Sequence, residues 1–400
     1  MSVVLDRPYR FIQPYRGNLW PALIQRFRIV DHYLRLKEGV HSFECRNIEA
    51  FEHALAEQKG ILLSPNHCRY ADPLVMGWPA RLAKTHVYAM ASWHLFNKSW
   101  LDGFAIRKMG GFSINREASD RQSLETAIDI LSSAERPLIL FPEGTTSRMN
   151  DRLKDLLDGV TFIARSAARR SQKKHGRSVV ILPVAIKYLC KTDCTSWVEE
   201  QLDQLEIFLK ANHEKSPNKV DRVGRLLEHW LNCQELQTLG EVKSGSFQER
   251  RLQLASEIMN RIDEQLGTST DSEDLPERIR SIRSEIVLKC FGESVVDISV
   301  LKAATKLVVL CQELITFDDD YLIDGGVTDT RLVETIQRLQ EICFGKARQN
   351  FPLHAVIQFG DQIDVPAGKS PRGQRDPLVE GIRDQLEDML VQLSQEALPC

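Results

Sequence analysis

The chain has 400 residues, of which 42% are hydrophobic and 27% are charged, so it can bury a large core and by length could hold two domains. No stretch approaches roughly 20 uninterrupted apolar residues, so no transmembrane helix is predicted and any membrane contact is expected to be peripheral. Residues 1–200 hold 29 Lys and Arg against 21 Asp and Glu, whereas residues 201–400 hold 23 against 34. The amino-terminal half is therefore expected to meet phosphates, anionic lipid or an acidic carrier protein, but no nucleic acid, unless its basic residues only form a solvated face.

The cysteines favour a reduced compartment. There are nine of them, an odd number, and none stands in a Cys-x-x-Cys pair or behind a secretory signal, so we expect a cytoplasmic protein. Cys190 and Cys194 lack paired His or Cys residues elsewhere, so no metal site is predicted and both are interpreted as small apolar residues. Cys68 follows a histidine directly, but neighbouring side chains generally point apart, and we interpret it as a packing residue.

A basic amphipathic segment lies near the start of the sequence. Apolar residues recur at helical spacing over residues 18–36, which predicts a helix. Basic residues are interspersed at Arg26, Arg28 and Arg35. Such a segment could lie in the headgroup layer of a membrane, or it could dock its apolar stripe on the protein core.

Short apolar strands then alternate with helices. Strands are predicted at 40–46, 61–64, 86–90, 111–115, 137–141 and 179–186, and helices at 48–58, 74–83, 93–109, 120–134 and 151–170. This alternation is typical of an α/β fold in which helices flank a sheet, and loops at the strand ends carry the functional residues.

After Leu189 the pattern becomes predominantly helical. Helices are predicted at 196–212, 219–237, 247–266, 275–290, 298–316 and 329–345, before strand character returns at 353–365 and a last helix covers 376–393. We therefore predict a discontinuous α/β domain with a mixed sheet, made of residues 1–195 and 350–400. A mostly helical insertion over residues 196–349 interrupts it, and the sequence does not reveal the role of this insertion.

One polar turn combines a histidine with a carboxylate. Residues 64–73 read Ser-Pro-Asn-His-Cys-Arg-Tyr-Ala-Asp-Pro and follow a predicted strand. A carboxylate that fixes the tautomer of a histidine makes it a general base, and His67 and Asp72 could form such a pair. On a regular helix they would lie about 140° apart, so the pair requires a bend between Pro65 and Pro73. Alternatively, Asp72 only caps a helix that begins at Pro73.

Three later segments accompany this turn. Residues 110–116 read Gly-Gly-Phe-Ser-Ile-Asn-Arg, residues 138–147 read Leu-Ile-Leu-Phe-Pro-Glu-Gly-Thr-Thr-Ser, and residues 179–187 read Val-Val-Ile-Leu-Pro-Val-Ala-Ile-Lys. In this order and at this spacing, the four segments resemble the motif blocks of the glycerolipid acyltransferase superfamily, whose best-known class is 1-acylglycerol-3-phosphate acyltransferase. The segment Phe359-Gly-Asp-Gln-Ile363 and the last helix resemble the closure of that domain.

The resemblance implies roles for individual residues. His67 would be the general base and Asp72 would orient and support it, so that an acceptor hydroxyl attacks a thioester without an acyl-enzyme. Arg116 would bind the phosphate of the acceptor, although alone it could be a surface arginine paired with Glu117 or Asp120.

The third and fourth segments would bind the two substrates. By the resemblance, Glu143, Gly144 and Thr145 bind the acceptor, although alone they would form an ordinary turn with a helix cap. Pro183 would lie beside the acyl donor, although it is also simply the proline of a buried strand. Many bacterial relatives carry an arginine two residues after the glycine, whereas this sequence has Thr146, with Arg148 nearby, which leaves the acceptor head group open.

The resemblance implies an O-acyltransferase. It would move a fatty acyl group from acyl-CoA or acyl carrier protein to the free hydroxyl of a lysophospholipid, first of all 1-acylglycerol-3-phosphate. Alternatives are glycerol 3-phosphate or another lysolipid as acceptor, or a catalytically idle lipid-binding scaffold. We expect no cofactor and no metal, since the thioester is a co-substrate. The protein is expected to be cytoplasmic and peripherally associated with the membrane surface through its basic amino-terminal half.

Overall fold

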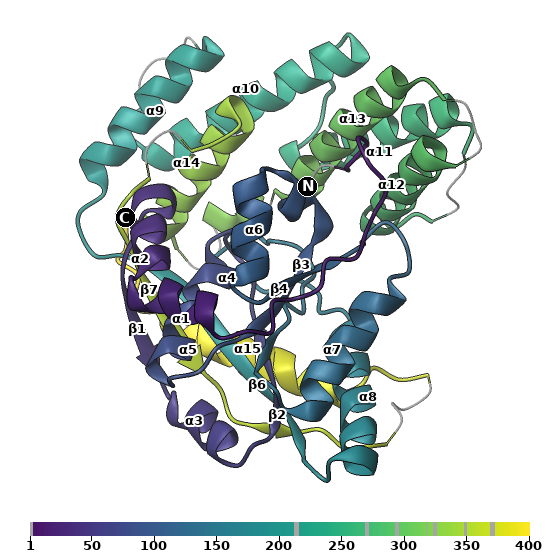
Figure 1. The fold of residues 1–400 in the computed structure, drawn as a ribbon. Helices are drawn as coiled ribbons and strands as arrows, with labels where there is room; N and C mark the ends of the chain where they lie inside the picture. The colour runs from purple at the N-terminus through teal and green to yellow at the C-terminus, as the bar shows by residue number, and fades with distance from the viewer. Residues whose placement is uncertain are drawn as a thin grey trace.

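The computed structural model describes residues 3–211, 216–268, 272–292, 296–317, 319–322, 326–347, 350–368 and 373–400. Within this part of the chain, eight strands form one sheet in the order β1-β7-β6-β2-β5-β3-β4, with β8 paired to β6 (Figure 1). The strands are β1 (Val40–Arg46), β2 (Gly60–Pro65), β3 (Tyr88–Ser92), β4 (Gly111–Ile114), β5 (Leu138–Ile139), β6 (Val179–Cys190), β7 (Leu353–Phe359) and β8 (Ile363–Asp364).

The sheet is mixed, as predicted. Strands β2 to β6 run parallel to one another, whereas β7 and β8 are antiparallel to β6 and β1 is parallel to β7. The carboxyl ends of β2 to β6 therefore meet at one edge of the sheet, where loops commonly carry functional residues. The loops that follow β2, β4 and β5 contain the first three sequence segments singled out above.

Helices cover both faces of the sheet. In the first half of the chain these are α1 (Leu19–Arg26), α2 (Ile29–Tyr33), the π-helix η1 (Leu34–Glu38), α3 (Glu49–Ala56), α4 (Asp72–Val75), α5 (Gly77–Leu82), the 3-10 helix η2 (Trp93–Asn97), α6 (Trp100–Lys108), α7 (Arg121–Ser133) and α8 (Gly159–Lys174). The later helices are α9 (Thr195–Leu209), α10 (Lys219–Leu239), α11 (Phe247–Leu266), α12 (Leu275–Phe291), α13 (Ile298–Thr316), the 3-10 helix η3 (Asp319–Leu322), α14 (Asp329–Phe344) and α15 (Pro377–Ser394).

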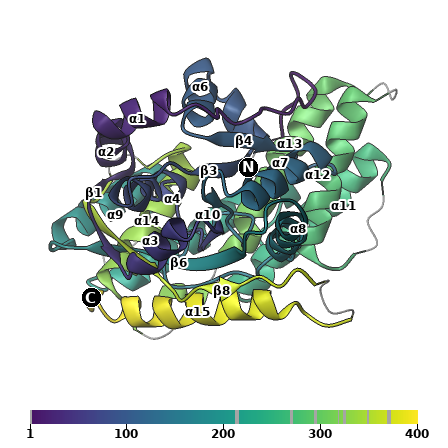
Figure 2. The same cartoon turned by 60° about the horizontal axis from the view of Figure 1, so that its bottom comes forward.

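Strand β6 organises the core because it is buried along its whole length. Its side chains alternate between the two faces of the sheet, as strand geometry requires. Ile181 and Leu189 belong to the cluster of α7, α8 and α15, and Figure 2 shows α15 running along that face. Leu182 and Ile186 belong to a second cluster, which includes residues of α3, α4 and α5.

The helices of residues 196–349 share that second core. One continuous cluster of buried apolar residues runs from β6 and α3 into α9 to α14, and Figure 1 shows these helices together on one side of the sheet. Capping side chains explain where several of them begin, because each accepts a hydrogen bond from a backbone N–H of the first turn. These caps are Asn218, Ser246, Asp274, Asp297 and Thr328. The division of the chain at residues 195 and 350 stays a prediction, and residue 349 lies outside the described residues.

Several predicted elements differ in the structure; the helix over 74–83, for example, is divided into α4 and α5. The single helix over residues 18–36 is wrong: α1 and α2 are separate, because Arg28 takes a left-handed φ of 52° between them. The helix expected from residue 151 begins only at Gly159, since the preceding loop is held by distant side chains. The strand expected over 353–365 is divided into β7 and β8. Among the described helices, none is both long and apolar enough to cross a membrane.

Candidate active site

The turn after β2 brings His67 and Asp72 together. His67 Nδ1 lies 2.8 Å from Asp72 Oδ2, and the same oxygen accepts a hydrogen bond from the backbone N–H of Arg69 at 2.8 Å. Asp72 is the first residue of α4, but its side chain does not cap that helix. Because a fully buried carboxylate accepts from the histidine, Nδ1 carries the proton and Nε2 keeps its lone pair.

The surroundings of the imidazole leave Nε2 as the nitrogen suited to a substrate proton. The ring stacks on Phe141, with centroids 4.1 Å apart, and the side chain of His67 is 13% exposed. Thr146 Oγ1 lies 3.4 Å from Nε2, a long contact for a hydroxyl group. A histidine in this tautomer can accept a proton from a hydroxyl group that approaches Nε2.

Two buried asparagines hold the loops that carry this pair. After the end of β2, the side chain of Asn66 continues the hydrogen bonding to β6. Ile186 N–H donates to Asn66 Oδ1 at 2.7 Å, and Asn66 Nδ2 donates to Ile186 O at 3.1 Å. Asn150 bonds Tyr188 in the same way, at 2.8 and 2.7 Å. Both asparagines therefore satisfy backbone groups of β6 that would otherwise be buried without partners.

Glu143 fixes the backbone of His67. Its Oε1 accepts a hydrogen bond from His67 N–H at 2.5 Å, and its Oε2 accepts one from Lys154 N–H at 3.1 Å. Burial raises the pKa of Glu143 to about 7, against the opposing effect of these two hydrogen bonds. Both carboxylate oxygens are thus engaged by the protein itself, and a role of Glu143 toward an acceptor stays a prediction.

Arg116 is joined to this loop through Gly144. Its Nη1 donates a hydrogen bond to Gly144 O. Gly144 has a φ of +69°, and a side chain there would meet Leu157, so both its conformation and its surroundings favour glycine. Burial, followed by the neighbouring Arg283, lowers the pKa of Arg116 to about 10, and Glu117 opposes this change. Thr145, next in sequence, is exposed.

The acids proposed as alternative partners of Arg116 have other partners. Glu117 accepts a hydrogen bond from Arg283 of α12, and Asp120 caps α7 by accepting from Ser123 N–H at 3.0 Å. Asp120 also accepts from Asn115 N–H at 2.9 Å, which fixes the turn before Arg116. Helix α12 therefore contacts the residue next to Arg116 directly.

Pro183 lies in the interior of the sheet. It pairs with Ser64 of β2, and Ser64 lies shortly before the turn that carries His67. The carbonyl of Pro183 accepts a hydrogen bond from Gly360 N–H at 2.9 Å. It faces the interruption between β7 and β8, where the absence of a proline N–H does least harm to the ladder. Contact of Pro183 with an acyl donor stays a prediction.

Cys68 is a packing residue in this geometry. It is fully buried, and its Sγ lies 3.9 Å from both Asp72 Oδ1 and Asn150 Oδ1. Burial, followed by the charge of Asp72, raises the pKa of the Cys68 thiol well above its usual range. A thiol kept protonated in this way is a poor nucleophile.

Two cations lie close to the site. Lys154 Nζ is 3.4 Å from Thr146 O, and burial lowers the pKa of Lys154 to about 8. Arg148 pairs with Glu341 of α14 and lies over the ring of Tyr70, 4.9 Å from its centroid. Of these two cations, the sequence singled out only Arg148, because it lies near Thr146, where many bacterial relatives have an arginine.

Sequence reasoning missed three further polar residues of the site. Asn66 adjoins the first motif and Tyr188 follows the fourth segment directly, so proximity could have suggested both. Asn150 gave no signal, because its partners lie on β6 and on the insertion.

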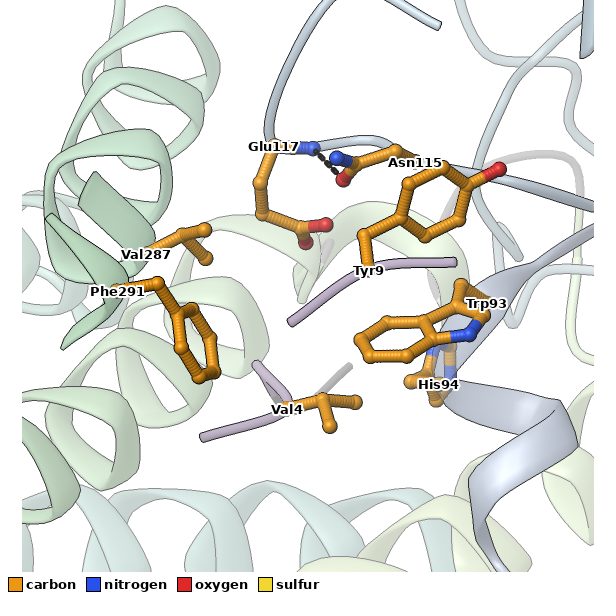
Figure 3. Close-up of a pocket in the computed structure, with 8 residues that line it drawn as sticks. All are labelled: Val4, Tyr9, Trp93, His94, Asn115, Glu117, Val287 and Phe291. Atoms are coloured by element: carbon orange, nitrogen blue, oxygen red, sulfur yellow. Dashed lines mark hydrogen bonds between the residues drawn. The ribbon is translucent and has the colours of Figure 1, made fainter. Parts of the chain in front are cut away.

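A small cavity lies between the amino-terminal segment, η2 and α12. Its volume is about 20 Å³, enough for about one water molecule and too small for an acyl chain. Figure 3 shows its lining, which consists of Val4, Tyr9, Trp93, His94, Asn115, Glu117, Val287 and Phe291. In it, Glu117 N–H donates to Asn115 Oδ1 at 3.1 Å. Burial lowers the pKa of His94 to about 3.

Part of the chain is similar to a known protein family. Residues 42–187 match the family model described as Acyltransferase, and His67, Asp72, Arg116 and Glu143 all lie in this segment. This similarity, together with the α/β fold, supports the glycerolipid acyltransferase superfamily for residues 42–187.

A particular relative supports this assignment. The chain is similar to a 1-acyl-sn-glycerol-3-phosphate acyltransferase of Streptococcus pneumoniae (strain ATCC BAA-255 / R6), with 32% identity over 114 residues. The alignment covers 28% of this chain and 40% of that relative, so the chain spans less than half the length of the relative.

Proposed function

We propose that the protein is an O-acyltransferase that moves a fatty acyl group from acyl-CoA or acyl carrier protein to the free hydroxyl of a lysophospholipid. The pair of His67 and Asp72 carries this proposal, because it has the geometry of an oriented general base. The pneumococcal relative, a 1-acyl-sn-glycerol-3-phosphate acyltransferase, favours 1-acylglycerol-3-phosphate as the acceptor. The reaction needs no cofactor and no metal in this proposal.

His67 and Asp72 would act in one direct displacement. His67 Nε2 takes the proton of the acceptor hydroxyl while its oxygen bonds to the thioester carbonyl carbon. The carbon–sulfur bond then breaks, and His67 returns the proton to the thiolate. Asp72 stays ionised and stabilises the imidazolium in between. The burial of Cys68 supports a route without an acyl-enzyme.

Arg116 and the loop after β5 would hold the acceptor. Arg116 stays a cation at neutral pH with a pKa of about 10, and a guanidinium binds phosphate through two hydrogen bonds. The exposed Thr145 and the backbone of Gly144 would contact the glycerol part, while Glu143 would keep the loop in place. Because Thr146 replaces an arginine, glycerol 3-phosphate or another lysolipid remains the alternative acceptor.

The amino-terminal half would meet the membrane surface. Leu19 and Phe27, at either end of α1, are 63% and 66% exposed, and Trp100 of α6 is 76% exposed. Trp20 and Phe104 join these two helices edge to face at 5.1 Å, and Lys108 lies beside them. Exposed apolar side chains with nearby cations suit an anionic lipid surface better than a protein core.

The test of the transferase is thiol release from palmitoyl-CoA and from palmitoyl carrier protein, with and without 1-acylglycerol-3-phosphate. We expect acceptor-dependent release that falls at least roughly a hundredfold in His67→Ala. His354→Ala is the matched control, since His354 is a partly buried histidine on β7 that bonds Ser42 and should leave release unchanged. Absence of release with every lysolipid in a panel would favour the idle lipid-binding scaffold instead.

Arg116→Gln separates the acceptors. Loss of the guanidinium should raise KM for acceptors with a phosphate monoester and leave KM for a neutral monoacylglycerol unchanged. An equal rise in KM for both acceptors would contradict a phosphate-binding role.

The membrane proposal has its own test. Trp100→Ser should weaken cosedimentation with vesicles of phosphatidylglycerol and phosphatidylcholine by about tenfold, because one large apolar contact is lost. Ile207→Ser is the control, since Ile207 is 78% exposed on α9 in the insertion. Equal losses in both variants would locate the lipid contact elsewhere.

A further inference from the structure

The hydroxyl group of Tyr188 completes the bonding of the catalytic carboxylate. Tyr188 Oη donates to Asp72 Oδ1 at 2.6 Å, while Asp72 Oδ2 receives His67 Nδ1 and the N–H of Arg69, each at 2.8 Å. Tyr188 and Asp72 are both fully buried, so water does not compete for these bonds. Both oxygens of the carboxylate are thus held by donors from two separate elements, β6 and the loop after β2.

We propose that Tyr188 is a positioning residue for the proposed transfer reaction, which keeps Asp72 ionised and turned toward His67. A buried carboxylate keeps its charge only if hydrogen-bond donors compensate for the lost water. Because one oxygen faces the tyrosine, the other faces the imidazole in one fixed orientation. Tyr188 itself remains a donor, since burial raises the pKa of its hydroxyl group well above the usual range.

The helical insertion holds Tyr188 in place. Asn150 bonds both the N–H and the carbonyl of Tyr188, and Asn150 N–H donates to Glu334 Oε2 of α14 at 2.9 Å. The same carboxylate oxygen accepts from Tyr321 Oη at 2.6 Å. A chain of hydrogen bonds therefore runs from α14 through Asn150 and Tyr188 to Asp72 and the base.

Tyr88 of β3 provides a matched control, since it is also fully buried and donates to a carboxylate, Glu135, at 2.6 Å. Tyr188→Phe removes the hydroxyl that faces Asp72, whereas Tyr88→Phe removes a hydroxyl that belongs to a different hydrogen-bond network. Both variants keep the aromatic ring, so the packing loss is similar. Both also leave the other titratable groups around the pair in place, namely Glu38, Cys68, Arg69, Glu143 and Glu334.

The first readout does not depend on acyl transfer. The full chain is labelled with ¹⁵N-histidine, and His67→Gln identifies the His67 signals among the ten histidines. In Tyr188→Phe, the less stabilised Asp72 should attract a proton to the pair, so the pH midpoint of the His67 signals should rise by about half a unit to one unit. In Tyr88→Phe the midpoint should stay within about 0.2 units of the wild type.

The second readout is the reaction itself, so this part of the inference rests on the proposed function. Loss of positioning should lower kcat roughly tenfold in Tyr188→Phe with KM unchanged, and should leave Tyr88→Phe near the wild type. If the wild type releases no thiol with any acceptor, the proposed function fails, while the NMR titration still decides the role of Tyr188.

Two results would overturn the inference: an unchanged midpoint in Tyr188→Phe, or equal shifts in both phenylalanine variants. Should Tyr188→Phe fail to fold by circular dichroism, Tyr188→Met fills the site without a donor and is titrated in the same way.

Discussion

Two successive helices of the insertion bury very different side chains. α13 buries an apolar stripe made mainly of Leu301, Ala304, Val308, Cys311 and Leu314, at the spacing of one helix face. α14 also buries apolar residues, but alongside them it buries carboxylates, amides and a guanidinium, namely Asp329, Glu334, Gln337, Arg338 and Gln340. α13 therefore needs only a core, whereas α14 needs specific polar partners.

The loops of residues 1–195 supply several of those partners. Glu334 accepts from Asn150 N–H, Gln337 accepts from Arg69 at 2.5 Å, and Glu341 pairs with Arg148. These partners lie on the loops that carry or flank His67 and Glu143. The difference between the two helices shows that residues 196–349 help to support the site. The contacts that provide this support come from α14 rather than from α13.

A cavity in α13 should cost stability without changing catalysis. Leu301→Ala removes a buried side chain from the apolar stripe and should lower the free energy of unfolding by about 2–5 kcal/mol, measured by urea denaturation. The rate per folded molecule should stay within about twofold of the wild type, since α13 packs mainly on α11 and α12. If fully folded Leu301→Ala showed a large fall in kcat, α13 and α14 would not differ in their effect on catalysis.

Glu143 tests a buried carboxylate in the candidate active site. Its folded-state pKa of about 7 lies above the ordinary value of 4.5, so its contribution to stability is full below pH 4.5 and is lost as pH rises through 7. Glu143→Gln does not titrate in this pH range. Relative to that variant, the free energy of unfolding of the wild type should fall by about 3 kcal/mol as the pH rises from 4.5 to 7. Parallel curves for the two proteins would show that burial does not raise the pKa of Glu143.

Glu334→Leu makes α14 resemble α13. The substitution leaves Asn150 N–H and the hydroxyl of Tyr321 without their carboxylate acceptor, so the free energy of unfolding should fall by about 1–3 kcal/mol. Unlike Leu301→Ala, it should also lower kcat roughly tenfold, because Asn150 carries Tyr188. Denaturation and single-turnover rates on the same preparations separate the two effects. An unchanged kcat would mean that α14 serves stability alone.

The sequence predicted the regular elements well where periodicity is continuous. The strand over residues 40–46 has those bounds in β1, and the predicted helix over residues 298–316 coincides with α13. The predicted helix over 18–36 was wrong because its apolar spacing continues across Arg28, where only the backbone conformation changes. The helix at Gly159 starts late because Glu143 holds Lys154 N–H in the preceding loop, a contact that no local pattern records.

The sequence by itself determined the α/β class, the resemblance to the glycerolipid acyltransferase superfamily and the pairing of His67 with Asp72, because these follow from local periodicity and from motifs a few residues long. Only the tertiary structure decided how that pair is supported. Tyr188 is 116 positions from Asp72, and Glu334 is 184 positions from Asn150. Each of these bonds satisfies a buried polar group with a partner that the chain can reach only after it has folded, so their identity depends on packing rather than on sequence spacing.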